Sequence, residues 1–267
     1  MILIGSGDSA DVYQIGHGRV LKLFNDNEYF TREYEACKYI GDMTPFAPQV
    51  FDKVYVDNRD GYEMQELIGE LLIDVIDDSD ELEYYGELMG QSHEMLHNWD
   101  TSSLELPHLK ERLRIYIAQL SHISDDIKTW GISIIDGLED DRSLLHGDYM
   151  PYNLMYLDDK LTAMDWSDAM LGPKEADIAR TIYFIIDPNE YEDAKYTLKS
   201  NKFIKAYLSG YYGNEIPVSI IHQWLIINAI LELDKFIVSR ISNNFTQRLS
   251  DFIQNNQKEM GSDYLFE

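Results

Sequence analysis

Hydrophobic and polar residues follow different spacings in the two parts of this chain. Short apolar runs separated by turn residues predict strands in the first part, at 2–4, 13–15, 20–24, 50–56 and 61–67, with one helix at about 28–40. From residue 71 onward, helical spacing predicts helices at 81–98, 108–129, 174–186, 190–211, 217–240 and 243–258. The pattern therefore predicts an α+β fold with two lobes, a small antiparallel β-rich N-lobe at 1–66 and a larger, mainly helical C-lobe at 67–267.

One hairpin is predicted within the helical part, where two apolar runs within 154–164 flank a charged turn at 158–160. A hairpin returns its end to its beginning, so Asn153 and Asp165 should lie side by side, with Asp148 on the loop that enters the hairpin. An amide oxygen and a carboxylate together suit a hard cation such as Mg²⁺. A second carboxylate nearby, free of metal, is able to accept a proton from an attacking hydroxyl.

The motif H-G-D at 146–148, followed by Asn153 and by D-W at 165–166, resembles the catalytic loop and metal-binding aspartate of the aminoglycoside phosphotransferase and choline kinase-like small-molecule kinases. The resemblance implies a bilobal, protein kinase-like fold. It also implies that Asp148 is the catalytic base and that Asn153 and Asp165 hold Mg²⁺. The sequence departs from many relatives at 149–152, where a His-Pro-Gly often precedes the asparagine.

The segment after the first strand matches the kinase glycine-rich loop, with Ala10 in the place of the third glycine. Glycines let backbone N–H groups approach phosphate oxygens, and serine hydroxyls add donors. The nucleotide-binding residues predicted in this loop are Gly5, Ser6, Gly7 and Ser9.

Lys22 interrupts an apolar strand, so it either reaches the surface or has a buried anionic partner. In the kinases that the chain resembles, this lysine contacts the α- and β-phosphates. Glu33 is the predicted partner, because it shares a helix face with apolar residues up to Ile40. Glu35 is the alternative, on a more polar face.

The second strand of the third hairpin ends in a segment, 64–69, that resembles the hinge between the lobes of these kinases. Backbone groups read the adenine edge there. By position, Gln65 and Leu67 would present those groups.

A rival pattern lies in the helix predicted at 81–98, where His93, Glu94 and His97 fit the zinc-protease motif H-E-x-x-H. Neither His108 nor Glu111 offers a third ligand with familiar spacing. The zinc-hydrolase interpretation is therefore disfavoured, and the motif is interpreted as coincidence on a core-facing helix.

Charge and cysteine content restrict the partners and the compartment. The chain has 48 acidic and 22 basic residues, a net charge of −26, which disfavours nucleic acid and anionic membranes and favours cationic ligands. The same charge is also compatible with solubility alone. The single Cys37 excludes an internal disulfide framework and suits the cytoplasm. No signal peptide or membrane span is predicted.

These features together predict an ATP- or GTP-dependent kinase, with Mg²⁺, that phosphorylates a hydroxyl of a small, cationic molecule. An aminoglycoside-like antibiotic is the favoured acceptor. Acidic segments at 70–87, 139–141 and 190–193 are candidates to recognise ammonium groups or simply face water. Choline-like amines, sugars and homoserine stay open as acceptors, as does a non-catalytic nucleotide-binding role. The sequence does not indicate the oligomeric state.

Overall fold

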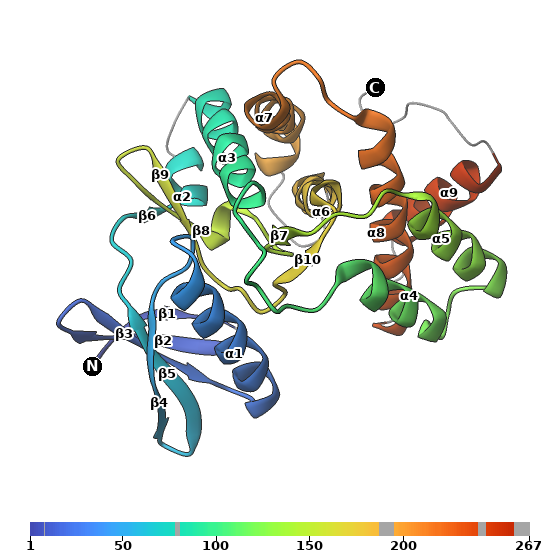
Figure 1. Ribbon diagram of the computed structural model, residues 1–267. Coiled ribbons are helices and arrows are strands. Elements are labelled where there is room, and N and C mark those ends of the chain that lie inside the picture. The colour runs from blue at the N-terminus through green and yellow to red at the C-terminus, as the bar shows by residue number, and fades with distance from the viewer. Residues whose placement is uncertain (8, 78–80, 187–194, 240–243, 259–267) are drawn as a thin grey trace. The chain divides into compact units, whose positions relative to one another are not determined.

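The computed structural model describes residues 1–7, 9–77, 81–186, 195–239 and 244–258 (Figure 1). Five antiparallel strands form the N-terminal sheet in the order β1-β2-β3-β5-β4. Their bounds are β1 Ile2–Ser6, β2 Ala10–Gly16, β3 Arg19–Phe24, β4 Val50–Val56 and β5 Arg59–Gln65. The predicted β-rich N-terminal part, with one helix, is therefore present.

The helix of this part, α1 (Asn27–Met43), packs against the sheet (Figure 1). Phe30 contacts Phe24 of β3 and stacks on Tyr34, and Tyr34 contacts Tyr62 of β5. Burial of several aromatic side chains stabilises the packing by about 1.5–3 kcal/mol each. This aromatic core fixes α1 over the strand that carries Lys22.

Two hairpins are closed by two-residue turns with left-handed backbone. Asp57 and Asn58 have φ of 51° and 60°, and Asp158 and Asp159 have φ of 48° and 59°. Asn and Asp tolerate this conformation, and turns built from it have a backbone twist that matches the twist of the flanking strands. The turn predicted at 158–160 and the gap between the strands predicted at 50–56 and 61–67 are therefore too long. The strand β5 begins two residues earlier than predicted, and the strand at 160–163 begins one residue earlier.

The predicted hairpin at 154–164 is confirmed as β8 (Leu154–Leu157) and β9 (Lys160–Ala163), joined by β6 (Glu70–Leu71) in a three-stranded sheet. A short helix α2 (Leu72–Asp77) and the 3₁₀ helix η1 (Pro151–Asn153) flank it. Gly69 allows β6 to approach β8, because a Cβ there would lie 2.2 Å from the carbonyl oxygen of Tyr156.

Most of the remaining chain is helical. The longer elements are α3 Leu82–His97, α4 Leu109–Gln119, α5 Asp125–Gly137, α6 Lys174–Ile186, α7 Lys195–Tyr212, α8 Val218–Val238 and α9 Asn244–Lys258, with β7 Ser143–Leu145 paired to β10 Met170–Gly172. Helices α3 and α7 pack closely at glycines. A Cβ on Gly90 would lie 2.1 Å from the carbonyl oxygen of Tyr207, and one on Gly210 would lie 2.2 Å from that of Glu87.

The single helix predicted at 108–129 is wrong, because the chain breaks after Gln119 and starts α5 at Asp125. Ser124 is the cap of α5, and its hydroxyl accepts the N–H of Ile127 at 3.4 Å. The cap signal was present in the sequence, since a serine precedes two aspartates. The starts predicted at 190 and 243 and the end predicted at 240 lie outside the described residues.

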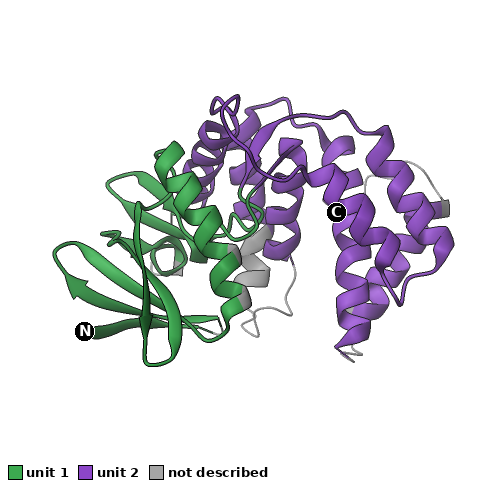
Figure 2. Cartoon of the chain, turned by 60° about the horizontal axis from the view of Figure 1, so that its bottom comes forward, with its two compact units in different colours: residues 1–81, 146–169 green, residues 82–145, 170–267 purple. Residues whose placement is uncertain are grey.

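Contacts divide the chain into two compact units (Figure 2). Unit 1 comprises 1–81 and 146–169, and unit 2 comprises 82–145 and 170–267. The predicted lobes, 1–66 and 67–267, divide the chain differently from these two units, and the lobe boundary stays a prediction. Among the described residues, every helix is too short or too polar to cross a membrane.

Candidate active site

The loop that precedes η1 is held by His146, which is fully buried. Its Nε2 lies 2.8 Å from the carbonyl oxygen of Met164, and its Nδ1 accepts the N–H of Asp148 at 3.2 Å. Since a carbonyl oxygen only accepts, one neutral tautomer with the proton on Nε2 satisfies both bonds. Gly147 has φ of 82°, and a Cβ there would lie 2.7 Å from Asp168 Cβ. Histidine and glycine thus fix the backbone that carries Asp148.

The side chain of Asp148 is oriented by two residues that follow it closely in sequence. Asn153 Nδ2 donates to Asp148 Oδ2 at 2.7 Å and to the Asp148 carbonyl oxygen at 3.0 Å. The Tyr152 hydroxyl lies 3.1 Å from Oδ1 and 3.3 Å from Oδ2. Asp148 and Tyr152 are half-buried, so the carboxylate is held in place at a solvent-accessible position.

Asn153 and Asp165 lie at the open end of the β8–β9 hairpin, as the sequence predicts. The Met164 N–H donates to the Asn153 carbonyl oxygen at 2.8 Å, which brings the next residue, Asp165, beside Asn153. Asp165 has φ of 57°, a left-handed conformation that is uncommon outside glycine. The adjacent Trp166 is fully buried, and its indole N–H donates to the Ala163 carbonyl oxygen at 3.1 Å.

The residues present fit a divalent cation. Asp165 Oδ1 is buried without a hydrogen-bond partner in the described part of the chain. Asn153 uses its Nδ2 for Asp148, which leaves its side-chain oxygen as the remaining polar atom. A buried, unpaired carboxylate oxygen is costly, and a cation with oxygen ligands would remove that cost.

Lys22 on β3 forms an ion pair with Glu33 on α1, with 2.5 Å between Nζ and Oε1. The Tyr62 hydroxyl donates to the same Oε1 at 2.6 Å, from the residue that pairs with Lys22 across β3 and β5. Glu35 instead pairs with Lys53 at 3.1 Å on the exposed surface. The structure therefore pairs Lys22 with Glu33, which the sequence analysis favoured without excluding Glu35.

The pKa values of Lys22 and Glu33 also depend on the charge of Asp165. Burial acts to lower the pKa of Lys22, but the carboxylates of Glu33 and then of Asp165 outweigh it, so the pKa is raised. Burial raises the pKa of Glu33, and the charge of Lys22 offsets only part of that rise. Lys22 is thus kept protonated between two acids, one on α1 and one after the hairpin.

The predicted phosphate loop lies between β1 and β2, and residue 8 within it is outside the described residues. The Gly7 N–H donates to the Ala10 carbonyl oxygen at 3.0 Å, and the Ser9 carbonyl oxygen accepts the N–H of Asn25 at 2.8 Å. Among the described residues beyond its two chain neighbours, a Cβ on Gly5 or Gly7 would meet no atom closer than 3.7 Å. The packing of the described residues therefore does not require either glycine.

The Ser6 hydroxyl, which was predicted to donate a hydrogen bond to a phosphate, donates to another residue of the protein. Its hydroxyl donates to Asp11 Oδ1 at 2.6 Å, and Asp11 pairs with Arg59 at 2.7 Å. The hydroxyl bond and the Arg59 guanidinium lower the pKa of Asp11. Ser6 would have to exchange this bond for one to a nucleotide.

The hinge segment continues from β5. The Gln65 N–H donates to the Gln49 carbonyl oxygen at 2.8 Å, and the Glu66 N–H donates to that of Gly18 at 2.9 Å. Leu67 comes next and makes no hydrogen bond to the described residues through its backbone. Of the two predicted hinge residues, Leu67 is therefore the one whose backbone groups have no hydrogen-bond partner among the described residues.

The rival motif on α3 forms a buried network within unit 2. His93 and His97 place their Nε2 atoms 3.2 and 3.3 Å from Asp177 Oδ2 on α6. Their Nδ1 atoms lie 2.7 Å from the Tyr207 hydroxyl and 2.8 Å from the Tyr211 hydroxyl, respectively.

Neutral histidines satisfy this network without a metal, if each donates from Nε2 to the carboxylate and accepts from a tyrosine. Glu94 does not join the cluster, because it accepts a hydrogen bond from Asn98 at 3.5 Å. The hydrogen bonds of Asp177 to both histidines, despite the opposing effect of burial, hold its pKa well below its usual range. These hydrogen bonds of Asp177 join α6 to α3.

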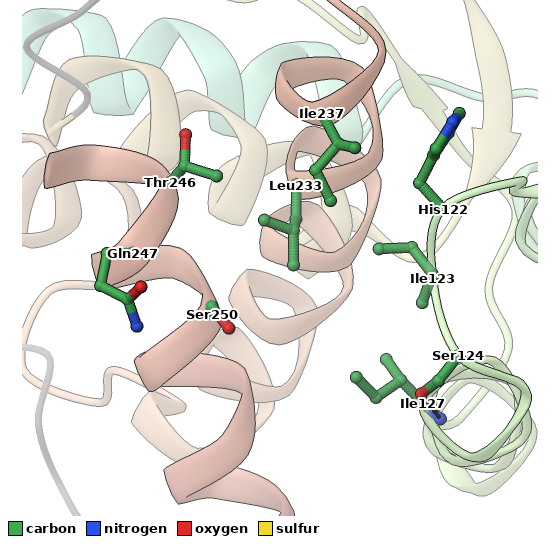
Figure 3. Close-up of a pocket in the computed structure, with 9 residues that line it drawn as sticks. All are labelled: His122, Ile123, Ser124, Ile127, Leu233, Ile237, Thr246, Gln247 and Ser250. Atoms are coloured by element: carbon green, nitrogen blue, oxygen red, sulfur yellow. Dashed lines mark hydrogen bonds between the residues drawn. The ribbon is translucent and has the colours of Figure 1, made fainter. Parts of the chain in front are cut away.

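A separate cavity of about 390 Å³ lies in unit 2, between the α4–α5 connection and helices α8 and α9 (Figure 3). Apolar side chains such as Ile123, Leu233 and Ile237 line it, with His122 and Gln247 among its polar residues. None of the described residues that line it is acidic. The cavity therefore lacks the charge expected for recognition of an ammonium group.

A paired lysine and glutamate, a loop aspartate, and an asparagine beside a second aspartate form the constellation of a phosphoryl-transfer enzyme. The sequence matches the model of the phosphotransferase enzyme family over residues 1–211, and the chain belongs to this family. The predicted enzyme class, a kinase that transfers a phosphoryl group, is confirmed. No curated protein matches the sequence.

Solved structures of small-molecule kinases confirm the protein kinase-like fold. A thermostable mutant of aminoglycoside phosphotransferase APH(4)-Ia has a TM-score of 0.65 at 14% identity, over 96% of this chain and 94% of that chain. Amicoumacin kinase hAmiN, in complex with AMP-PNP, Ca²⁺ and Ami, has a TM-score of 0.64 at 15% identity, over 100% and 90%. A choline/ethanolamine kinase family protein from Mesorhizobium loti has a TM-score of 0.62 at 12% identity, over 98% and 88%.

Proposed function

We propose that this kinase transfers the γ-phosphoryl group of ATP to a hydroxyl of a small, cationic molecule, with Asp148 as the catalytic base. The observation that carries the proposal is the arrangement in unit 1, where Asp148 is oriented by Asn153, and Asp165 shares its electrostatic environment with Lys22. Lys22 would bind the nucleotide phosphates, and Glu33 would orient it. GTP is the alternative nucleotide.

In the proposed reaction, Asp148 orients the acceptor hydroxyl and accepts its proton as the oxygen attacks the γ-phosphorus. Phosphoryl transfer has a loose transition state, so positioning and neutralisation of charge supply most of the catalysis. Asn153 and Asp165 would hold Mg²⁺, which when bound neutralises phosphate charge. The Leu67 backbone would face the adenine edge, and the Gly5–Ser9 loop would lie over the phosphates.

The acceptor is proposed to be cationic because the chain carries a net charge of −26. Such a field attracts polycations and raises their rate of encounter, and it repels nucleic acid and anionic lipids. An aminoglycoside-like antibiotic fits this charge best. Choline-like amines are the second candidate, and the similarity to a choline/ethanolamine kinase family protein supports them.

The cytoplasm is the proposed compartment, because ATP is the donor and the single Cys37 is a buried, free thiol. The acidic segment at 190–193, a candidate for ammonium recognition, lies outside the described residues.

The proposal is tested by ADP release from Mg-ATP against a panel of aminoglycosides, amino alcohols, sugars and macrolides. We expect stimulation by one cationic class and none by the neutral sugars. Mass spectrometry of the stimulating compound should show one added phosphoryl group. A protein that fails to bind Mg-ATP would refute the kinase proposal, whereas stimulation only by neutral acceptors would refute the cationic acceptor alone.

A further inference from the structure

The Tyr152 hydroxyl lies within hydrogen-bonding distance of Asp148, the proposed catalytic base. A general base has to lie about 2.6–3.2 Å from the proton donor that it serves. The phenol oxygen lies 3.1 Å from Oδ1 and 3.3 Å from Oδ2, so it faces both carboxylate oxygens at once. The phenol is thus an intramolecular hydroxyl held against the catalytic base.

The geometry follows from the 3₁₀ helix between the two residues. Pro151 starts η1, and the Asn153 N–H donates to the Met150 carbonyl oxygen at 2.8 Å, which tightens the loop. The tight turn brings residue 152 back to residue 148. Because Asn153 Nδ2 also holds Oδ2 at 2.7 Å, the carboxylate cannot rotate away from the phenol without breaking that bond.

Asp148 and Tyr152 are half-buried rather than enclosed, so water reaches this part of the loop. A carboxylate poised to deprotonate a hydroxyl would also deprotonate water when nucleotide is bound and no acceptor is present. The water oxygen would then form a bond to the γ-phosphorus, and the bond from that phosphorus to the β–γ bridging oxygen would break. ADP would leave with the electron pair, and the proton would pass from Asp148 to solvent.

We propose that the Tyr152 hydroxyl keeps water from binding to the Asp148 carboxylate, and that an acceptor hydroxyl displaces the phenol when it binds. This inference rests on the proposed kinase function. Tyr152 acts through Asp148, so it is a positioning residue. Its consequence is a low rate of ATP hydrolysis in the absence of acceptor.

The test is the rate of ADP release from Mg-ATP alone, in wild type and in Tyr152→Phe. The variant keeps the ring and removes only the hydroxyl, so water can take the vacated place beside Asp148. We expect hydrolysis to rise about tenfold, the effect of losing one hydrogen bond to a charged group. A rise in rate is informative because partial unfolding lowers activity.

Tyr156→Phe is the matched control. Tyr156 also donates its hydroxyl to an aspartate, Asp159 Oδ1 at 2.9 Å, but on the β8–β9 hairpin. Its hydrolysis rate should equal that of wild type. The double variant Tyr152→Phe with Asp148→Asn should lose the added hydrolysis, which would show that the gain depends on the base. Tyr152→Leu should change the rate in the same direction as Tyr152→Phe.

Three results would overturn the inference. If Tyr152→Phe binds Mg-ATP normally but hydrolyses it no faster than wild type, the phenol does not keep water from Asp148, while the kinase proposal stands. Phosphate on Tyr152 after incubation of the wild type with Mg-ATP would make the phenol an acceptor instead. If the wild type does not bind Mg-ATP, both the proposed function and the role proposed for Tyr152 are refuted.

Discussion

Lys22 Nζ and Glu33 Oε1 are 2.5 Å apart, and the two side chains are only 13% and 5% exposed. The pair joins β3 to α1, and the Tyr62 hydroxyl donates to the same glutamate oxygen. Removal of one partner leaves the other charge buried and uncompensated, which costs far more than loss of a surface pair. The site therefore depends on this relationship both for its shape and for the charge of Lys22.

Glu33→Gln is expected to weaken Mg-ATP binding about tenfold, because Lys22 loses the carboxylate that orients it. Isothermal titration calorimetry measures the affinity. Glu35→Gln is the matched control, since Glu35 pairs with Lys53 on the surface and should bind Mg-ATP as wild type does. Equal affinities in all three proteins would contradict the role of Glu33.

Asp165→Asn is expected to abolish the gain in ATP affinity that Mg²⁺ gives. The predicted ligand is the carboxylate oxygen that has no hydrogen-bond partner among the described residues, and an amide oxygen is a much weaker ligand for this ion. ATP affinity is measured with and without EDTA. Asp158→Asn, in the β8–β9 turn, should keep the full Mg²⁺ effect. A wild-type Mg²⁺ effect in Asp165→Asn would remove this residue from the metal site.

Asp177 should make the stability of the fold sensitive to acid. Its pKa in the folded state lies well below the ordinary value of 3.8, so its stabilising contribution is present above pH 3.8 and is lost as the pH falls through the folded-state value. Urea unfolding at pH 7 should show Asp177→Asn less stable by about 3 kcal/mol. The variant should lose less stability than wild type below pH 3.8. An equal loss of stability with falling pH in both proteins would contradict this role of Asp177.

Cys37 is expected to be unreactive in the folded protein. Burial and then the charge of Glu33 raise its pKa to about 12, and the thiol is only 3% exposed. Since the thiolate is the reactive form, an aromatic disulfide reagent at pH 8 should react slowly with native protein and fully with protein in guanidinium chloride. Fast reaction in the native state would show that α1 opens readily from the sheet.

The sequence predicts the parts of this site that depend on local patterns. The hairpin after Asn153 follows from two apolar runs and a charged turn, and it places Asp165 beside Asn153. The helical face of Glu33 was enough to favour it as the partner of Lys22. In each case, spacing along one element determines which side chains share a face.

The residues that the sequence analysis missed depend on contacts between elements or on an unpredicted turn. Tyr62 reaches Glu33 only because β5 pairs with β3 in the observed register. The approach of Tyr152 to Asp148 requires η1, which was not predicted, although the proline at 151 was a signal for a tight turn. The partners of Asp177 depend on how α6 is placed against other helices, since α6 packs on α7 and Asp177 reaches two histidines of α3. Periodicity within one helix carries no information about that placement.

The most direct test of the central claim compares nucleotide binding with turnover in Asp148→Asn. The amide keeps the shape of the side chain but cannot accept the proton of an acceptor hydroxyl. We expect Mg-ATP affinity within about twofold of wild type, and acceptor-stimulated ADP release to fall by a factor of about 10²–10⁴. A variant that retains turnover, or that loses binding and turnover equally, would contradict the assignment of Asp148 as the catalytic base.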